Sequence, residues 1–362
     1  MSHGRLGTLP PLPLGVYARK AVRELPFPLG AVGSRVYARA RHGLWHGMQA
    51  LGLQPGDDVL TPAYHHGSEV EALVRAGLTP RFYAAGDALE PDADELRRLL
   101  TPGTRALYLT HYLGFPQDAA RWRAWCDEQE LLLVEDAAQA WLATLHGVPL
   151  GSFGDLSIFC MYKTFGIPDG GIVLVRPPAA PPSGPRGRAP LGLGAAARRN
   201  ALWLLQRSAR LSALAPDAPS QPYDPKADFA LGDPDSPPVL VSMALLRRIV
   251  DGEAAAHRRQ HYATILAELS DRASPPFDRV PAGASPFAFP METDDKEDAL
   301  RRLAAHGILG LDFWSVPHST LDVARFPEAA RRRARTVALP VHQELKPHDL
   351  RRIVAAAHGT RH

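Results

Sequence analysis

The chain alternates between short apolar runs and longer segments of helical pattern across its first half. The apolar runs are nearly continuous, which is the pattern of strands buried on both sides. Such strands interleaved with helices are typical of a mostly parallel sheet covered by helices on both faces. The predicted strands are 58–62, 79–83, 105–112, 131–136, 157–161 and 171–175, and the predicted helices are 37–51, 67–76, 92–100 and 117–129.

The second half departs from this alternation. Residues 177–238 hold 13 of the 35 prolines and are interrupted by one helical pattern at 195–214. We interpret that helix as an amphipathic packing element; a membrane-surface anchor is the alternative, but one short helix with a few arginines binds membranes weakly. A long helix at 241–269 is predicted next, followed by a strand near 286–291, a helix at 295–305 and a final helix from His348.

These patterns predict an α/β protein of three parts. The parts are an N-terminal arm at 1–30, a large α/β domain at 31–240 that includes the Pro-rich excursion 177–238, and a small C-terminal α/β domain at 241–362. Ligands of such sheets gather beyond the carboxyl ends of the strands. Polar groups that end a strand, such as those of 131–136, are therefore candidates for chemistry.

Composition narrows the class of protein. The chain has 362 residues, 45% of them hydrophobic and 22% charged, which is ordinary for a globular protein. The formal net charge of +3 is spread among acids, so nucleic-acid binding is not indicated. The two cysteines form no CxxC pair, no apolar run is long enough to span a membrane, and no signal peptide is recognisable, so we expect a cytoplasmic protein.

Lys163 is the first candidate for chemistry. It is one of only five lysines, it follows a buried-strand pattern, and it precedes Gly170-Gly171 by seven residues. Paired glycines allow a close approach of backbone. We expect an apolar setting to destabilise the ammonium and to make the amine a nucleophile toward carbonyls. A solvated surface lysine is the alternative.

Asp136 is the second candidate. It ends the predicted strand 131–136 and is followed by the small residues of "AAQAW". Such an aspartate either caps the next helix or keeps the pyridine nitrogen of pyridoxal phosphate protonated, which makes the ring an electron sink. A lysine and an aspartate at two strand ends, with Gly-Gly beyond, favour the second interpretation.

Histidine pairs indicate no metal site. His42/His46 and His257/His261 have the i, i+4 spacing of helix-borne zinc ligands, but neither pair has the glutamate of HExxH or an evident third ligand. We interpret them as surface or packing residues. No phosphate-binding P-loop or dinucleotide fingerprint is present.

Several motifs together resemble the DegT/DnrJ/EryC1/StrS family of fold-type-I, pyridoxal-phosphate (PLP)-dependent aminotransferases. "VEDAAQAW", "GSFGDLSIF" and a lysine with Gly-Gly at +7 and +8 carry the resemblance. "ALGLQPGDDVLTPAYHH", "THYLGFPQD", "VSMALLRRI" with "HRRQHY", and "LPVHQELKPHDLRRI" support it. The likeness runs from about residue 37 to the end and is weakest across 177–238.

The resemblance implies roles for individual residues. Lys163 would form the internal aldimine with PLP and move protons between cofactor and substrate carbons. Asp136 would pair with the pyridine nitrogen, and Gln139 would lie near the phenolic oxygen of the cofactor. His66 takes the place of an aromatic residue that stacks on the ring, with a plain loop histidine as the alternative.

The chain also departs from the family pattern at the phosphate end. Arg39-Ala40-Arg41 stands where the family has Ser/Asn-Gly-Thr, and Cys160 replaces a serine. Two residues are missing before Lys163, and the Asn-x-Arg that reaches across from the partner subunit is not apparent. We expect Arg41 or Arg39 to bind the cofactor phosphate; a helix-surface arginine is the alternative.

The resemblance implies transamination by a homodimer, from an amino-acid donor such as glutamate to a keto-sugar, in family members often nucleotide-linked, or to a related ketone. The departures put the keto-sugar in question. A different PLP reaction such as dehydration is one alternative; related sugar dehydratases carry histidine in place of the lysine, so Lys163 argues against it. A catalytically retired scaffold that binds a sugar or a protein is the other.

Overall fold

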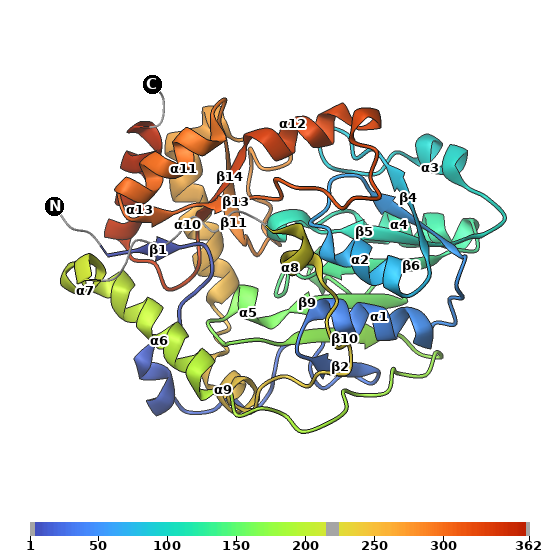
Figure 1. Ribbon diagram of the computed structural model, residues 1–362, viewed down its shortest axis with the longest axis horizontal. Helices are drawn as coiled ribbons and strands as arrows, with labels where there is room; N and C mark the ends of the chain where they lie inside the picture. Colours follow the sequence, from blue (N-terminus) through green and yellow to red (C-terminus); the bar gives the residue numbers. More distant parts are fainter. Residues whose placement is uncertain (1–3, 215–223, 360–362) are drawn as a thin grey trace.

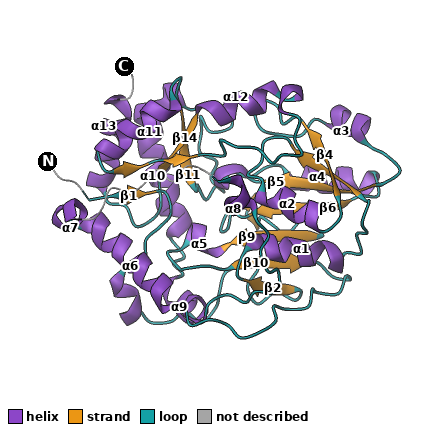
Figure 2. Cartoon of the chain, in the orientation of Figure 1, coloured by secondary structure: helices purple, strands orange, loops and turns teal. Residues whose placement is uncertain are grey.

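The large domain is built on one seven-stranded sheet with the order β2-β10-β9-β6-β5-β3-β4 (Figures 1 and 2). The computed structural model describes residues 4–214 and 224–359. The five strands from β9 to β4 are parallel, whereas β10 runs antiparallel to both β9 and β2. The strands are β2 (Ser34–Tyr37), β3 (Asp58–Pro62), β4 (Thr79–Tyr83), β5 (Thr104–Thr110), β6 (Leu132–Ala137), β9 (Leu156–Cys160) and β10 (Gly171–Val175).

Helices cover both faces of this sheet. Side chains alternate along a strand, so Ala106 and Tyr108 of β5 pack in the cluster that includes α1 (Ala40–Ala50) and α2 (Ser68–Arg75). Leu107 and Leu109 pack in the opposite cluster, which includes α3 (Ala93–Leu99) and α4 (Ala119–Glu128). The predicted mostly parallel sheet with helices on both faces is confirmed.

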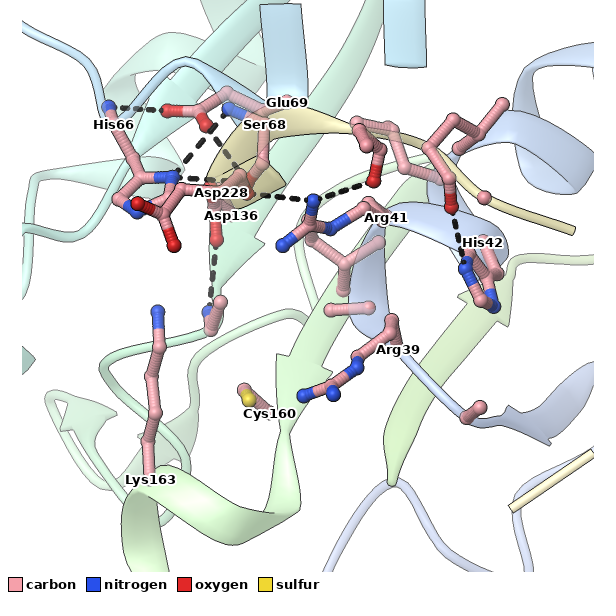
Figure 3. A pocket seen from close by; sticks show the side chains of 18 of the residues that line it. Arg39, Arg41, His42, His66, Ser68, Glu69, Asp136, Cys160, Lys163 and Asp228 are labelled. Atoms are coloured by element: carbon pink, nitrogen blue, oxygen red, sulfur yellow. Dashed lines mark hydrogen bonds between the residues drawn. The ribbon is translucent and has the colours of Figure 1, made fainter. Parts of the chain in front are cut away.

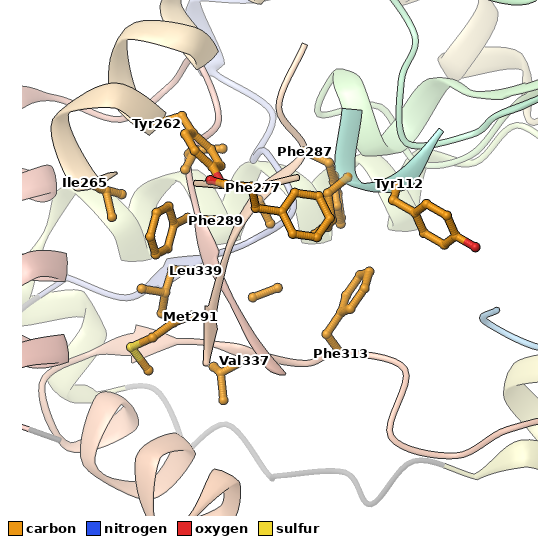
Figure 4. Packing of buried hydrophobic residues seen from close by; sticks show 14 of the residues in the cluster. Tyr112, Tyr262, Ile265, Phe277, Phe287, Phe289, Met291, Phe313, Val337 and Leu339 are labelled. Carbon is orange, nitrogen blue, oxygen red and sulfur yellow. The ribbon is translucent and has the colours of Figure 1, made fainter. Parts of the chain in front are cut away.

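A smaller antiparallel sheet has the order β11-β14-β13. We propose that this sheet and its helices form the small C-terminal domain, which we call the second domain. Its aromatic and aliphatic core continues to Tyr112 of the large domain, so one hydrophobic cluster joins the two domains (Figure 4). The elements are α10 (Ala254–Leu269), η3 (Ser270–Arg272), β11 (Ala288–Glu292), α11 (Lys296–Ala305), β12 (Ile308–Leu309), β13 (Leu311–Asp312), η4 (Val323–Arg325), α12 (Pro327–Arg335), β14 (Thr336–Pro340) and α13 (Pro347–His358).

The N-terminal arm contacts both domains. Its strand β1 (Leu6–Gly7) pairs in parallel with β12, and its 3-10 helix η1 (Leu14–Ala18) packs on α9 (Leu240–Ile249). Between these two points the arm passes Gly166, where a Cβ atom would lie 2.1 Å from the Pro11 carbonyl oxygen. The arm therefore lies against the segment that follows Lys163.

Two of the predicted helices are each broken into two. The single helix predicted at 241–269 is α9 followed by α10, separated at residues 250–253, because Asp251-Gly252 forms a turn. The helix predicted at 195–214 is α6 (Leu193–Arg207) followed by α7 (Ala209–Leu214), because Ser208 has an extended backbone. Among the described helices, none combines the length and apolar character needed to cross a membrane.

The predicted start of the first helix is also wrong. Tyr37 lies at the end of the unpredicted strand β2, and α1 begins only at Ala40 with Arg39 as N-cap. The remaining short elements are η2 (Tyr112–Gly114), β7 (Thr144–Leu145), β8 (Val148–Pro149), α5 (Met161–Thr164) and α8 (Pro225–Phe229).

The Gly-Gly pair does allow a close approach of backbone, as predicted. Gly170 has a φ of +121°, which L side chains rarely adopt, and its N–H donates to the Ala38 carbonyl at 3.0 Å. A Cβ atom on Gly171 would lie 2.0 Å from the backbone nitrogen of Ala40. The two glycines thus bring β10 against the N-terminus of α1.

Candidate active site

A cavity of about 610 Å³ lies at the carboxyl ends of the central strands. Its walls come from β6, β9, α5 and the N-termini of α1 and α2, from the segment around α8, and from Trp314 of the second domain. Figure 3 shows Lys163 pointing toward Asp136 across it, with Arg39 and Arg41 on the side of α1. The structure brings together all six predicted site residues in its lining: His66, Arg41, Asp136, Gln139, Cys160 and Lys163.

Asp136 is held rigidly at the end of β6. Its Oδ1 accepts a hydrogen bond from the Ala138 N–H at 2.8 Å, and its Oδ2 accepts one from the Tyr108 hydroxyl at 2.8 Å. Burial and the adjacent carboxylate raise the pKa of Tyr108 well above its usual value, so the hydroxyl remains a donor. The Asp136 carboxylate therefore has one orientation.

Lys163 stands on α5, a single helical turn, and not on the strand itself. Its Nζ lies 5.9 Å from the centre of the Phe287 ring, and among the described residues no acceptor is within hydrogen-bond distance of it. The Lys163 side chain is therefore not held in place by a hydrogen bond of its own among the described residues.

The expected lowering of the Lys163 pKa is wrong. Burial does lower it, but nearby Cys160, Tyr162, Asp136 and Glu69 raise the pKa, and the net shift is upward. The cavity is buried without being apolar, because two carboxylates face the amine. The amine is consequently cationic in the cofactor-free chain near neutral pH.

Gln139 and His66 occupy different parts of the cavity wall. The Gln139 Oε1 accepts a hydrogen bond from the backbone N–H of Leu113 at 2.8 Å, which leaves the amide NH₂ as its donor group. The His66 ring lies edge-on to Trp314, with ring centres 6.4 Å apart. Burial, together with the charge of Lys163, lowers the pKa of His66 well below its usual value, so the ring is neutral.

Glu69 was not predicted as a site residue. It is 6% exposed and lines the cavity from the first turn of α2. Its carboxylate accepts from the backbone N–H groups of His66 at 2.8 Å and Gly67 at 3.1 Å. Burial and the negative charge of Asp136 raise the pKa of Glu69. A glutamate two residues after a glycine N-cap is a capping signal, but the sequence does not show that it faces a cavity.

Arg39 and Tyr162 form the wall beside Cys160. The Arg39 guanidinium carbon lies 5.4 Å from the Tyr162 ring centre, and Arg199 of α6 lies 6.0 Å from the same ring. Burial raises the pKa of the Cys160 thiol despite the lowering influence of Lys163, so Cys160 is a neutral thiol. Within the described residues, Arg39 forms no salt bridge. This wall carries positive charge at the N-terminus of α1.

Arg41 also lines the cavity, but one of its amino groups is committed elsewhere. Nη1 donates to the backbone carbonyls of Asp228 and Ala230, both at 2.8 Å. His42 adds a bond from Nε2 to the Leu231 carbonyl at 2.8 Å. We call residues 224–236, which these contacts hold across the cavity, the strap.

The strap is anchored at its far side by Phe229. That ring packs against Gly67, where an added Cβ atom would lie 2.3 Å from it, and its centre is 5.9 Å from the His318 ring. Sequence reasoning missed the strap and Trp314, because a Pro-rich segment and a late aromatic carry no local sign of where they fold back. Tyr162 could have been predicted to line the cavity, since it immediately precedes Lys163 in the sequence.

The two histidine pairs make contacts of a packing kind. His42 bonds the strap, His46 lies 3.1 Å from Asp235, and His261 bonds the carbonyl of His342 at 3.1 Å. Among the described residues, no group of three histidine, cysteine or acidic side chains is arranged to hold a metal ion.

Comparison with known proteins finds a similarity to one family. Residues 35–180 match the model of the DegT/DnrJ/EryC1/StrS aminotransferase family. This match, which spans the seven-stranded sheet, confirms the resemblance seen in the sequence.

Two curated relatives each match about a third of the chain. The dTDP-4-dehydro-2,3,6-trideoxy-D-glucose 4-aminotransferase of Saccharopolyspora spinosa is 35% identical over 134 residues, which are 36% of this chain and 35% of the relative. The GDP-perosamine synthase of Vibrio cholerae is 33% identical over 130 residues, 35% of each chain. The alignments thus span about a third of the length of these relatives.

A solved structure extends the likeness to nearly the whole fold. The PLP form of a putative sugar aminotransferase, Spr1654 of Streptococcus pneumoniae, has a TM-score of 0.63 and 17% identity, covering 91% of this chain and 88% of its own. The two proteins share a fold, and the predicted fold class is confirmed.

Proposed function

We propose that this chain, whose residues 35–180 match the DegT/DnrJ/EryC1/StrS family, is a PLP-dependent aminotransferase. It would move an amino group from an amino-acid donor such as glutamate to a keto-sugar or related ketone. One observation carries the proposal: the Lys163 amine and the fixed carboxylate of Asp136 face each other across one buried cavity. The relatives that act on nucleotide-linked sugars support the acceptor class.

The lining of the cavity fits PLP. The buried Thr110 Oγ1 lacks a hydrogen-bond partner among the described residues, and Thr110 pairs in register with Asp136. The N-terminus of α1 offers backbone N–H groups and the Arg39 charge for a phosphate. When bound, PLP supplies an electron sink for the carbanion formed at the donor carbon.

The residues of the chain would divide the work as follows. Asp136 would keep a proton on the pyridine nitrogen, and the bonds from Ala138 and Tyr108 orient it for this. Lys163 would bind the aldehyde through Nζ and then, once released, carry a proton between two carbon atoms. Because the pKa of Lys163 is raised, Nζ is protonated in the free chain and must lose a proton before it attacks the aldehyde.

The remaining walls would bind the cofactor and keep water out of the cavity. The Gln139 NH₂ is positioned to donate to the phenolic oxygen, and the neutral ring of His66 is suited to stacking. Arg39 is better placed than Arg41 to bind the phosphate, since Arg41 already holds the strap. Trp314 and the strap would cover the acceptor side.

The direct test is spectroscopic. The chain reconstituted with PLP should be yellow, and added glutamate should bleach the visible band with release of 2-oxoglutarate. A protein that stays colourless at saturating PLP would favour the retired scaffold. A band that persists with glutamate but changes with a deoxy-keto-sugar would favour a different PLP reaction.

Assembly as a homodimer is a further part of the proposal and rests on the family resemblance. Sedimentation at micromolar concentration should give about twice the chain mass of 39.3 kDa. A single species at the chain mass would contradict it.

A further inference from the structure

We propose that Arg258 is a positioning residue for Lys163, which it holds through the backbone of α5. This inference rests on the proposed function, since it concerns the lysine that would react. Arg258 lies on α10, beyond the matched residues 35–180, and it is 1% exposed. Its Nη2 donates to the carbonyl oxygens of Lys163 at 3.2 Å and Thr164 at 2.7 Å.

The other donors of Arg258 are also used. Nη1 donates to the Pro286 carbonyl at 3.1 Å, and Nε donates to the Gln343 Oε1 at 2.8 Å. Gln343 in turn donates from Nε2 to the Thr164 carbonyl at 3.0 Å. The turn that carries Lys163 is therefore tied to three separated parts of the second domain.

This contact is not an ordinary ion pair. Among the described residues Arg258 forms no salt bridge, and every acceptor is an uncharged oxygen. Burial lowers the pKa of Arg258 to about 9, against the raising influence of Glu344. Burying a guanidinium without a carboxylate is costly, so we expect Arg258 to stabilise a particular group of backbone acceptors.

The acceptors that Arg258 stabilises are the carbonyl groups at the C-terminal end of α5. The helix has only four residues, Met161–Thr164, and is too short to be stable by itself. Its last carbonyls lack helical partners, and a cation is the favoured group at such an end. By bonding these carbonyls, Arg258 fixes the backbone from which the flexible Lys163 side chain reaches the cavity. Displacement by about 1 Å at a reacting group can cost about 100-fold in rate.

The experiment compares two adjacent arginines. Arg258→Met removes every donor and keeps a chain of similar shape. Arg259→Met is the matched control, because Arg259 donates only to the Ala284 carbonyl, at 2.8 Å, away from α5. The first readout needs no cofactor: Lys163 in the apo chain is labelled with an amine-reactive reagent across a pH series and quantified by peptide mapping.

The inference predicts different outcomes for the two variants. Arg258→Met should change the rate of labelling at Lys163 by about tenfold, or shift its apparent pKa by about one pH unit. Labelling of Lys346 should stay the same. In the PLP-loaded enzyme kcat should fall about 100-fold, with the KM for the donor within threefold. Arg258→Lys should recover part of both effects. Arg259→Met should match the wild type.

Other outcomes would overturn the inference. Identical Lys163 labelling profiles in Arg258→Met and Arg259→Met would do so, even if Arg258→Met melts at a lower temperature. If Arg258→Met does not fold, Gln343→Ala and Arg258→Lys must show the labelling change, and wild-type profiles in both would overturn it. A wild-type chain that never binds PLP refutes the proposed function; a labelling change in Arg258→Met would still leave the positioning role standing.

Discussion

The two walls of the cavity are built in different ways. Asp136 and Lys163 stand at or just beyond the ends of neighbouring strands, so the hydrogen bonds of β6 with β9 fix the two strand ends from which they project. The opposite wall, made by α1 and the strap, is held by side chains of Arg41 and His42 that bond backbone carbonyls far away in sequence. A ladder of backbone bonds tolerates single substitutions, whereas a few side-chain contacts do not.

This difference assigns separate tasks to the two walls. The sheet wall carries the groups that, under the proposed function, would act on the amino-acid donor; topology places Asp136, and topology together with Arg258 places Lys163. The strap itself lies in the Pro-rich excursion, outside the residues that match the family, whereas α1 lies within them. We expect changes in the sheet wall to remove the chemistry and changes in the strap wall to alter affinity and access.

The largest effect is expected from Lys163→Arg. The guanidinium keeps the positive charge but is a poor nucleophile, so the visible band of the wild type should not form and turnover should fall by several orders of magnitude. Borohydride reduction of the wild type followed by peptide mapping identifies the residue that binds PLP. A pyridoxyl label on a different lysine would refute the assignment.

Asp136→Asn should have the next largest effect. The amide cannot keep the pyridine nitrogen protonated, so we expect kcat to fall about 100- to 10,000-fold, while the visible band still forms. Tyr108→Phe serves as a graded companion, because it removes only one of the two bonds to Asp136. Wild-type turnover in Asp136→Asn would show that the carboxylate merely caps the chain turn.

Arg41→Ala tests the strap wall. Loss of the bonds to Asp228 and Ala230 removes about 1.5–3 kcal/mol each at most, so we expect affinity for PLP to fall about tenfold and proteases to cleave within 224–236. Titration of the visible band and limited proteolysis measure these effects. Arg98→Ala, an exposed arginine on α3, is the control. Unchanged cleavage in Arg41→Ala would contradict the description of Arg41 as the fastening of the strap.

The smallest effect is expected from acid. Burial lowers the pKa of His42 to about 4, below the value of about 6.5 in the unfolded chain. The unfolded state then binds more protons than the folded state below pH about 6.5, so the free energy of unfolding falls as pH drops toward 4.

The His42→Gln variant measures that dependence. Between pH 7.5 and pH 5, the free energy of unfolding should fall by about 1–2 kcal/mol less in this variant than in the wild type. Urea denaturation at the two pH values measures it, and His146→Asn, in an exposed turn, is the control. Equal losses in His42→Gln and wild type would show that burial does not lower the pKa of His42.

Sequence reasoning reached the sheet wall because its signals are local. Apolar runs, strand-end acids and Gly170-Gly171 each identify a place in a parallel sheet, and the cavity there contains every residue selected in advance. Local signals could not predict that Lys163 stands on a helical turn or that its pKa is raised. The upward shift of this pKa comes first from Cys160 and Tyr162 and then from Asp136 and Glu69, and the distances of these groups from the amine are set by tertiary packing.

The strap and the Arg258 contact could not be read from the sequence for the same reason. Arg41 was selected for a phosphate because of its position at a helix start, but the atoms that it bonds belong to residues nearly two hundred positions later. Arg258 lay in the middle of a helix predicted as continuous, and nothing nearby in the sequence distinguishes it from Arg259. Its acceptors become visible only when the two domains are packed together.

The pairing of the arm with the second domain constrains the order of events during synthesis. Leu6 is synthesised long before its partner Ile308, which follows the whole seven-stranded sheet along the chain. Long-range pairings of this kind form late in folding. Trp314 and Gln343 also follow that point, so the far wall of the cavity and the second bond to Thr164 are both absent while the sheet is already complete. A nascent chain therefore presents its lysine on an unfastened turn, and the site assumes its final geometry only once the residues up to Gln343 have joined the fold.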